Sequence, residues 1–179
     1  VMRAKPYEAT GFFDETNLLP LTDSSGNEVK LVQANGVTVI FYRGLQAGDY
    51  MTVTVDVPET GNYKMTSHFL KSPLYGMVQA YIDGQPVGGV YDGYAPAVEG
   101  PFAFEHGYIQ LTAGTHTIRY EVVGKNDQSG NYFIGLDELR LIPEGWEEPQ
   151  KLAVEAELVQ GTDGVGALVA RNDETGIRD

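Results

Sequence analysis

Alternation of apolar and polar residues is the dominant pattern of the chain between residues 37 and 142. In MTVTVDV (51–57), the methionine and the three valines fall on one side and the threonines and the aspartate on the other. NYKMTSHF (62–69) and HTIRYEVV (116–123) repeat this pattern. A period of two is typical of strands with one face in a hydrophobic core. The remaining predicted strands are 37–43, 77–83, 104–111 and 132–142.

The connections between these segments have the composition of tight turns. PETGNY (58–63) and LTAGTH (111–116) each contain a glycine, and Asp83-Gly84 is a strong signal for a two-residue hairpin. No amphipathic helical pattern separates the strands. About eight or nine short strands joined in this way predict an all-β fold, an antiparallel β-sandwich or jelly roll.

The composition changes after Pro143, which sets the expected domain organisation. We predict a β-sandwich over residues 1–143 and a linker over 144–151, because PEGWEEPQK is rich in proline and glutamate. Residues 152–179 carry too little apolar mass to fold alone. They are either the start of a following module or a tail that packs on the sandwich.

Charge and cysteine content exclude several classes of function. The 179 residues include 12 Lys and Arg against 25 Asp and Glu, a formal net charge of −13, and no cysteine. Such a surface repels phosphate backbones and anionic lipids, so we expect no nucleic-acid and no membrane partner. Disulfides and thiolate metal sites are excluded. The first residues, VMRAKPYEAT, show no apolar signal-peptide region, so any signal peptide is expected to have been removed or to lie upstream.

Four motifs in order carry a resemblance to a known family. They are PYEAT (6–10), GDYMTVTVDVPETGNYKM (48–65), LTAGTHTIRYEV (111–122) and NYFIGLDELRL (131–141). Together they resemble carbohydrate-binding modules of the family 6 and family 35 type. That resemblance implies a galactose-binding-like β-sandwich, and with it a non-catalytic module attached to a glycoside hydrolase or polysaccharide lyase.

The resemblance also implies a sugar site at the loop end of the sandwich. Sugar recognition uses aromatic rings that stack on pyranose faces and planar polar groups that bond hydroxyls. The expected ligand-binding residues come from three segments: Tyr42 and Arg43; Tyr91, Tyr94 and Phe102; and Asn126, Asn131 and Tyr132. The second group lies in a stretch rich in rings, glycine and proline, YDGYAPAVEGPFAFEHGY (91–108), which predicts an aromatic platform on a surface loop.

Several residues of these three segments also have a structural interpretation. Alternation predicts that Tyr108 and Phe104 point into the core, and part of the 91–108 cluster is expected to anchor the loop. Asn126 and Asn131 suit plain turn positions, and Arg43 could pair with an acidic neighbour.

The chain departs from the family pattern at two places. EAT replaces the usual EAE at residues 8–10, and the closing strand lacks the asparagine with which many family 6 members bond the sugar. By resemblance, Glu8 and Asp137 are the candidate ligands of a structural calcium, which binds carboxylate and carbonyl oxygens. For Asp137 the alternative is a hydrogen bond to a backbone amide at a bulge.

Catalytic patterns are weak in this sequence. The three histidines are scattered, and no G-x-S-x-G elbow occurs. Glu99 and Glu105 could be proposed as a glycosidase pair, but their loop-like surroundings favour solvated charges.

Three hypotheses follow. The first is a carbohydrate-binding module, secreted or at a bacterial cell surface, that targets a catalytic module of the same polypeptide to a polysaccharide or oligosaccharide. The second is a structural spacer or protein-interaction sandwich without a working sugar site, and the third is a small sandwich hydrolase.

Overall fold

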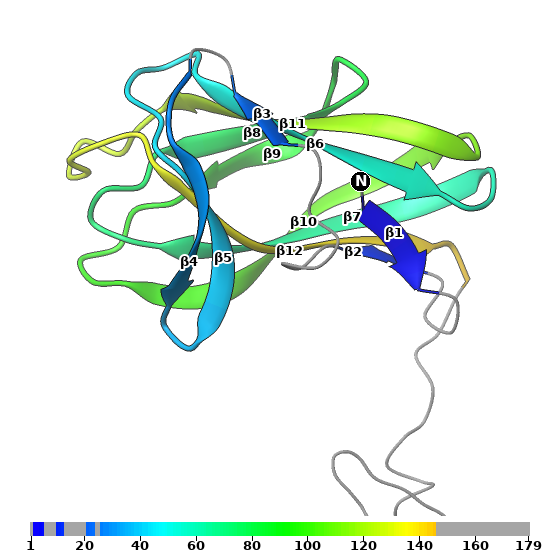
Figure 1. Cartoon of the computed structure of the whole chain (residues 1–179), viewed down its shortest axis with the longest axis horizontal. Helices are drawn as coiled ribbons and strands as arrows, with labels where there is room; N and C mark the ends of the chain where they lie inside the picture. Colours follow the sequence, from blue (N-terminus) through cyan, green and yellow to red (C-terminus); the bar gives the residue numbers. More distant parts are fainter. Residues whose placement is uncertain (1, 6–9, 13–20, 24–25, 146–179) are drawn as a thin grey trace, which may run out of the picture. The chain divides into compact units, whose positions relative to one another are not determined.

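The computed structural model describes residues 2–5, 10–12, 21–23 and 26–145 of the chain. They form strands and connections without a helix (Figure 1). The strands are β1 Met2–Lys5, β2 Thr10–Phe12, β3 Leu21–Asp23, β4 Val29–Ala34, β5 Val37–Tyr42, β6 Tyr50–Val57, β7 Gly61–Lys71, β8 Met77–Ile82, β9 Gln85–Asp92, β10 Glu99–Leu111, β11 Gly114–Gly124 and β12 Ile134–Pro143. This part of the chain therefore holds no apolar helix of bilayer-spanning length.

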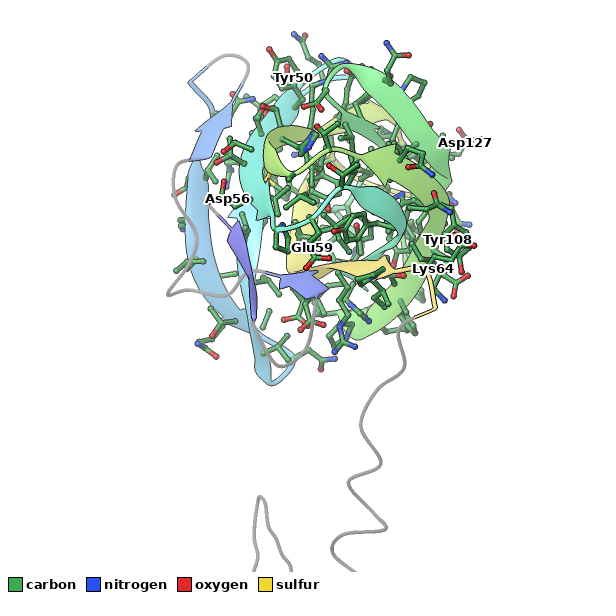
Figure 2. The ribbon with its side chains drawn as sticks, turned by 90° about the vertical axis from the view of Figure 1, so that its right-hand side faces the viewer. Tyr50, Asp56, Glu59, Lys64, Tyr108 and Asp127 are labelled. Carbon is green, nitrogen blue, oxygen red and sulfur yellow. The ribbon has the colours of Figure 1, made fainter. Side chains whose placement is uncertain are left out.

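The strands form the two layers of a sandwich. Layer A has the order β10-β7-β12-β5-β4, and layer B has the order β9-β8-β11-β6-β3. At one edge β2 pairs with β12 and β1 pairs with β6, so the two layers are joined there. Every described pairing between the named strands is antiparallel except that of β1 with β6, and two isolated bridges in the connections, Ser72 with Tyr94 and Tyr75 with Phe133, are also parallel. Figure 2 views the layers from the end that carries the Glu59 turn. The predicted all-β antiparallel sandwich is thus confirmed.

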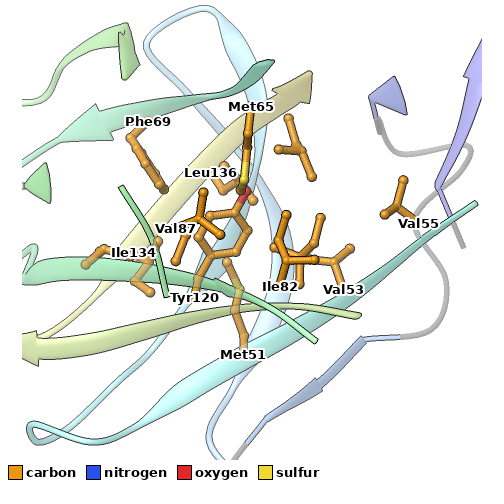
Figure 3. Close-up of a cluster of buried hydrophobic side chains, with 14 of the residues drawn as sticks. Met51, Val53, Val55, Met65, Phe69, Ile82, Val87, Tyr120, Ile134 and Leu136 are labelled. Atoms are coloured by element: carbon orange, nitrogen blue, oxygen red, sulfur yellow. The ribbon is translucent and has the colours of Figure 1, made fainter. Parts of the chain in front are cut away.

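The core lies between the layers and follows from the alternation in the sequence. In β6, every second residue from Met51 to Val57 is buried, and in β11 the same holds from His116 to Val122. Figure 3 shows Tyr120 of layer B among side chains from both layers, including Met65, Phe69 and Leu136. Burying such apolar side chains is the main source of stability in a fold of this kind.

A polar chain runs through this core. The Tyr120 hydroxyl lies 2.8 Å from Ser67 Oγ, which lies 2.8 Å from His106 Nε2. The three residues are 0%, 0% and 6% exposed, so these bonds satisfy groups that water does not reach. Burial lowers the pKa of His106 to about 4, which keeps its imidazole neutral near pH 7.

A second, smaller cluster packs against the outer side of layer A. It consists of Val39, Leu70, Tyr75 and Phe133, and the side chains of Val32, Ala34, Val37 and Phe41 from the β4–β5 hairpin pack against it. The hairpin thereby contacts the 125–133 connection through Phe133, whose ring lies 5.2 Å from that of Phe41.

The aromatic stretch 91–108 differs from its prediction. We expected a surface loop, but β9 runs to Asp92 and β10 begins at Glu99, so the connection spans only residues 93–98. The pairing of β10 with β7 continues past the glycines and the proline, with two register shifts, one between Glu99 and Phe102 and one between Glu105 and Gly107. Rings that were predicted on a loop are therefore mostly strand residues with one face toward the core.

The prediction that Tyr108 points into the core is wrong. Gly107 has a φ of 107°, a conformation that favours glycine, and it sits at the bulge where β10 gains one residue relative to β7. Before the bulge Phe104 packs against the core, and after it Ile109 does. Tyr108 is 58% exposed and lies beside its cross-strand partner Lys64 (Figure 2). One extra residue reverses which side chains face inward.

The described part of the chain ends just after the last strand. β12 ends at Pro143, and the Glu144 amide donates to the Asn62 carbonyl at 2.8 Å, so Glu144 is still bonded to the sandwich. The remainder of the expected linker and all of residues 152–179 lie outside the described residues. The predicted domain boundaries stay predictions.

Candidate functional site

Four connections meet at one end of the sandwich, on the left in Figure 1. We call this the loop end: residues 43–49, 72–76, 93–98 and 125–133, with the strand residues next to them. Main-chain hydrogen bonds join three of the connections: Ser72 N to Gly93 O at 3.0 Å, Gly93 N to Gly76 O at 3.0 Å, Gly76 N to Phe133 O at 2.9 Å and Gly130 N to Pro73 O at 2.9 Å. The fourth is tied to β11 by Gly48 N, which donates to Val122 O at 2.7 Å. The loop end is thus held by backbone contacts.

Tyr42 does not belong to the exposed surface of this end. Its side chain is 0% exposed, because alternation in β5 directs Ile40 and Tyr42 into the core. Asn27 Nδ2 donates to the Tyr42 hydroxyl at 3.2 Å and to Asp49 Oδ2 at 2.9 Å. No face of the ring is open to a sugar, so the predicted stacking role of Tyr42 is wrong for this conformation.

Tyr91 is also buried. It is 6% exposed, and its ring stacks on Phe69 with centroids 4.6 Å apart. Burial raises the pKa of its hydroxyl, whose oxygen has no hydrogen-bond partner among the described residues. The predicted ligand role fails because β9 continues to Asp92 and carries Tyr91 into the core. Tyr91 anchors the neighbouring connection, as expected for part of the 91–108 cluster.

Phe102 is the exposed ring of the predicted group. It is 40% exposed, and the Lys71 ammonium lies 5.7 Å from its centroid and 5.2 Å from that of Tyr91. Lys71 thus bridges a buried ring and an exposed ring by cation–π contacts. An exposed ring beside a cation offers both contacts that sugar recognition needs, an apolar face and a donor for hydroxyl or carboxylate oxygens.

Asp92 joins two connections of the loop end. Its Oδ1 accepts from the Tyr94 amide at 3.0 Å, and its Oδ2 accepts from Asn126 Nδ2 at 2.9 Å. The Asn126 Oδ1 in turn accepts from the Gln128 amide at 2.9 Å. Tyr94 itself is half-buried. The 93–98 and 125–133 connections are therefore clamped together through Asp92.

The two predicted asparagines show turn bonding. Asn131 Oδ1 accepts from the Tyr132 amide at 3.0 Å, as Asn126 Oδ1 does from Gln128. These bonds correspond to the structural alternative for both residues. Each side chain is half-buried, and a ligand contact by either one stays a prediction.

Tyr132 and Arg43 lie on the other side of the loop end. Tyr132 is half-buried against the core. A Cβ on Gly44 would lie 2.5 Å from the Tyr132 carbonyl oxygen, so the 43–49 connection passes tightly over it. Arg43 is exposed, and its guanidinium carbon lies 5.1 Å from the centroid of Phe133. The structure therefore brings Tyr132 and Arg43 to the loop end, as predicted, on different connections.

Asp137 is the described member of the predicted calcium pair, since Glu8 lies outside the described residues. It sits at a β12 bulge between Leu136 and Glu138, half-buried. Burial raises the pKa of Asp137, the Glu138 carboxylate raises it further, and the charges of His68 and Arg140 oppose this. The described residues hold no cluster of three or more His, Asp or Glu side chains suited to a metal ion. Asp137 alone is not a calcium site, and calcium stays a prediction.

Sequence reasoning missed Lys71 and Asp92. The signal for Lys71 was present, because alternation in β7 puts it on the same side of the strand as Phe69, next to the rings. Asp92 could not be found in this way, since its two acceptor roles depend on a contact with a connection 34 residues away.

Comparisons with known proteins agree with the β-sandwich fold. A segment of the solved xanthan lyase from Paenibacillus is similar to the chain with a TM-score of 0.63 and 25% identity, covering 72% of this chain and 12% of the lyase. The chain thus spans a small part of that enzyme. No protein-family model and no curated protein sequence matches the chain.

The solved structures that are similar to the chain include carbohydrate-binding modules of family 6 and of family 35, the two families that the sequence motifs resemble. A family 35 carbohydrate-binding module from an environmental isolate has a TM-score of 0.49 and 14% identity, covering 75% of this chain and 93% of the module. The carbohydrate-binding module CBM6cm-2 of lichenase 5A from Cellvibrio mixtus, solved with cellotriose, has a TM-score of 0.44 and 17% identity, covering 73% of this chain and 95% of the module. Both modules are of the families that the sequence motifs resemble.

Proposed function

We propose that the chain is a non-catalytic carbohydrate-binding module that uses the loop end to hold a polysaccharide or oligosaccharide. The observation that carries this proposal is Phe102, a large ring that is 40% exposed beside Lys71, which directly precedes the 72–76 connection of a rim fixed by main-chain bonds. A rim fixed in this way loses little conformational entropy on binding, which favours a weak polar ligand such as a sugar. Tyr94 and Tyr132 are half-buried and add two further partly open rings.

The targeting role is part of the proposal. The similar segment is 12% of the Paenibacillus xanthan lyase chain, which supports an accessory module within a larger enzyme. Linking a weak binding module to a catalytic module raises the local concentration of the enzyme on its polymer. Single-site binding with a dissociation constant between about 1 µM and 1 mM would suffice for this role.

A catalytic role for Glu99 and Glu105 has little support. The two residues are six positions apart on β10, about 15–20 Å along an extended strand, whereas a glycosidase pair lies about 5–9.5 Å apart. Glu105 pairs with Lys64 at 3.4 Å on the outer face of layer A. These carboxylates are therefore assigned to solvated surface positions.

The test is affinity electrophoresis and calorimetry against a panel of polysaccharides. The panel contains neutral polymers (galactomannan, β-glucan, xylan) and acidic ones (xanthan, polygalacturonate, alginate). We expect at least one to bind. Phe102→Ala should weaken binding about tenfold or more, which corresponds to about 1.4 kcal/mol, a magnitude typical of truncating an aromatic anchor at a binding surface. Tyr108→Ala is the matched control, because Tyr108 is a more exposed ring on a sheet face away from the loop end.

The spacer or protein-interaction hypothesis is the second candidate. The burial of Tyr42 and Tyr91 favours it, because two of the expected platform rings are unavailable to a ligand. It replaces the first proposal if the folded protein binds no member of the panel. Binding that responds to Tyr108→Ala and not to Phe102→Ala would move the site from the loop end to the sheet.

A further inference from the structure

Strand β4 forms one edge of layer A (Figure 1). Among the described residues it pairs only with β5, over Val29 to Ala34, and its outer side has no strand partner. The pairing runs without a register shift, and the strand contains neither proline nor glycine. Natural proteins usually protect an edge strand by such irregularities or by a covering segment, because an unpaired edge is a template for another strand. The outer edge of β4 is therefore able to accept a strand.

The other edges of the two layers are less suited to this role. β10 and β9 approach each other closely, since a Cβ on Gly88 would lie 2.3 Å from the His106 carbonyl oxygen. The pairing of each of these two strands within its own layer also contains register shifts, which interrupt a regular ladder. The fourth edge, β3, is three residues long. Of the described edges, β4 thus offers the longest regular one.

The hydrogen-bond pattern of the β4–β5 hairpin shows which main-chain groups of β4 point outward. The Arg43 amide donates to the Glu28 carbonyl at 2.9 Å, so Glu28 bonds toward β5. In an antiparallel pair, successive residues alternate between bonding to the partner strand and pointing to the opposite side. The amides and carbonyls of Val29, Leu31 and Gln33 therefore point away from β5. Leu31 adds an apolar side chain that is 42% exposed.

The charged side chains of β4 suit a second copy of the same strand. Glu28 and Lys30 lie on one face, both largely exposed, and form an ion pair of 3.1 Å within the strand. An antiparallel pair of β4 strands with a two-fold axis at Val29 places Glu28 of each copy opposite Lys30 of the other. Opposite charges that face each other across two strands stabilise their pairing, and a two-fold axis makes the contact occur twice. The strand is thus complementary to itself.

The register at Val29 also agrees with the main-chain pattern. The outward amide and carbonyl of Val29 in each copy then bond to those of the other, as in a hydrogen-bonded antiparallel pair. An axis at Lys30 would instead set two ammonium groups opposite each other, which is unfavourable. The net charge of −13 favours the monomer in general, but charges more than about 8 Å apart are screened at physiological ionic strength, whereas the cross-strand pairs are in contact.

We propose that the chain self-associates through β4, which pairs antiparallel with β4 of a second copy around Val29. Layer A then continues as one sheet through both copies. The pairing does not depend on what the loop end binds. It would present two loop ends in one particle, which strengthens the hold on any extended ligand that both can reach. Because the contact is one pair of short strands, we expect weak association, with a dissociation constant between about 10 µM and 1 mM.

The experiment is sedimentation equilibrium of the chain between about 10 µM and 2 mM, where we expect a reversible monomer–dimer equilibrium. Glu28→Lys and Lys30→Glu should each weaken dimerisation about tenfold or more, because like charges then face each other twice. The double variant exchanges the two charges and should restore it. Glu28→Lys makes the chain less acidic, so general repulsion predicts the opposite effect for that variant.

A second pair of variants tests the main-chain contact. Leu31→Pro removes an amide that points outward and none that bonds to β5, so the fold is retained while the ring blocks the edge. It should weaken dimerisation at least tenfold, whereas Leu31→Ala, which keeps the amide, should weaken it less than about threefold. Urea unfolding checks that both variants are folded.

Three results would overturn the proposal. The first is a monomer throughout the concentration range. The second is a dimer that Leu31→Pro leaves unchanged although the variant is folded, which would place the contact on another surface. The third is a double charge variant that dimerises no more tightly than either single variant.

Discussion

His116 Nδ1 lies 2.6 Å from Asp83 Oδ2, and its Nε2 lies 2.6 Å from the Thr112 carbonyl oxygen. A carboxylate and a carbonyl only accept hydrogen bonds, so both ring nitrogens must donate. The side chain is therefore an imidazolium in the folded protein, although it is 8% exposed. Asp83 Oδ1 also accepts from the Thr117 amide at 2.9 Å, which fastens the β8–β9 turn to β11.

This pair predicts a loss of stability at alkaline pH. Burial alone would lower the pKa of His116, but the bonds to Asp83 and to the Thr112 carbonyl raise it above its ordinary value. Because the pKa of His116 is raised in the folded protein, its protonated ring contributes its full stabilisation below the ordinary pKa of 6.5. This stabilisation is lost as the pH rises through the pKa of the folded state. Burial alone would raise the pKa of Asp83, but the Thr117 amide and His116 lower it, so the carboxylate persists to low pH.

The measurement is urea unfolding across pH 5–9 together with nitrogen chemical shifts of His116. We expect both ring nitrogens protonated at pH 6 and a stability loss above neutrality that His116→Gln removes. The variant itself should be destabilised by about 1–3 kcal/mol at pH 6. A neutral His116 ring at pH 6 would contradict this assignment.

His106 is expected to make the folded protein less stable at acidic pH, the opposite pH dependence to that expected from His116. Burial lowers its pKa from 6.5 to about 4, so the unfolded chain takes up a proton over that interval before the folded chain does. Its contribution is present above pH 6.5 and declines by up to about 3 kcal/mol as pH falls to about 4. His106→Gln, which can still bond Ser67, should flatten stability over this interval. An unchanged slope would assign the acid sensitivity to the carboxylates.

Most of the fold was predictable because the core-facing strands alternate strictly. The segments at 51–57, 62–69 and 116–123 became β6, β7 and β11 with the expected sides buried. Strand β9 was missed because QPVGGVYD is rich in glycine and its burial is irregular. The orientation of Tyr108 could not be obtained from alternation, since it depends on where β10 places a bulge.

Less of the candidate site was predictable, because exposure depends on where strands end. Tyr42 is the last residue of β5, and Tyr91 is the last but one of β9. Both side chains point into the core. The contacts of Lys71 with the rings of Tyr91 and Phe102 join residues that are 20 or more positions apart, so they leave no local pattern in the sequence.

Adjacent glycines in β9 provide a matched test of backbone packing. Gly88 has a φ of 71°, and a Cβ there would lie 2.3 Å from the His106 carbonyl oxygen, whereas nothing lies within 4 Å of a Cβ on Gly89. Gly88→Ala should therefore destabilise the protein by more than about 2 kcal/mol, and Gly89→Ala by less than about 1 kcal/mol. Thermal and urea unfolding of both variants test this. Equal effects would mean that β9 and β10 separate readily.

Tyr42→Phe should affect stability and not ligand binding. Removing the hydroxyl deletes a buried bond from Asn27, a loss of about 1 kcal/mol, while no atom of Tyr42 is exposed to a ligand. Unfolding by urea and affinity electrophoresis of the same variant separate the two effects. Weakened sugar binding at unchanged stability would return Tyr42 to the site.

The connections at the loop end are joined through main-chain amides and carbonyls, which every amino acid except proline supplies in full. Side chains on that rim other than Asp92, Asn126 and Ser129, which themselves join connections, can consequently be exchanged with little disturbance of its geometry. A single scaffold of this construction lends itself to successive changes of glycan preference, in evolution or in the laboratory, without a new fold.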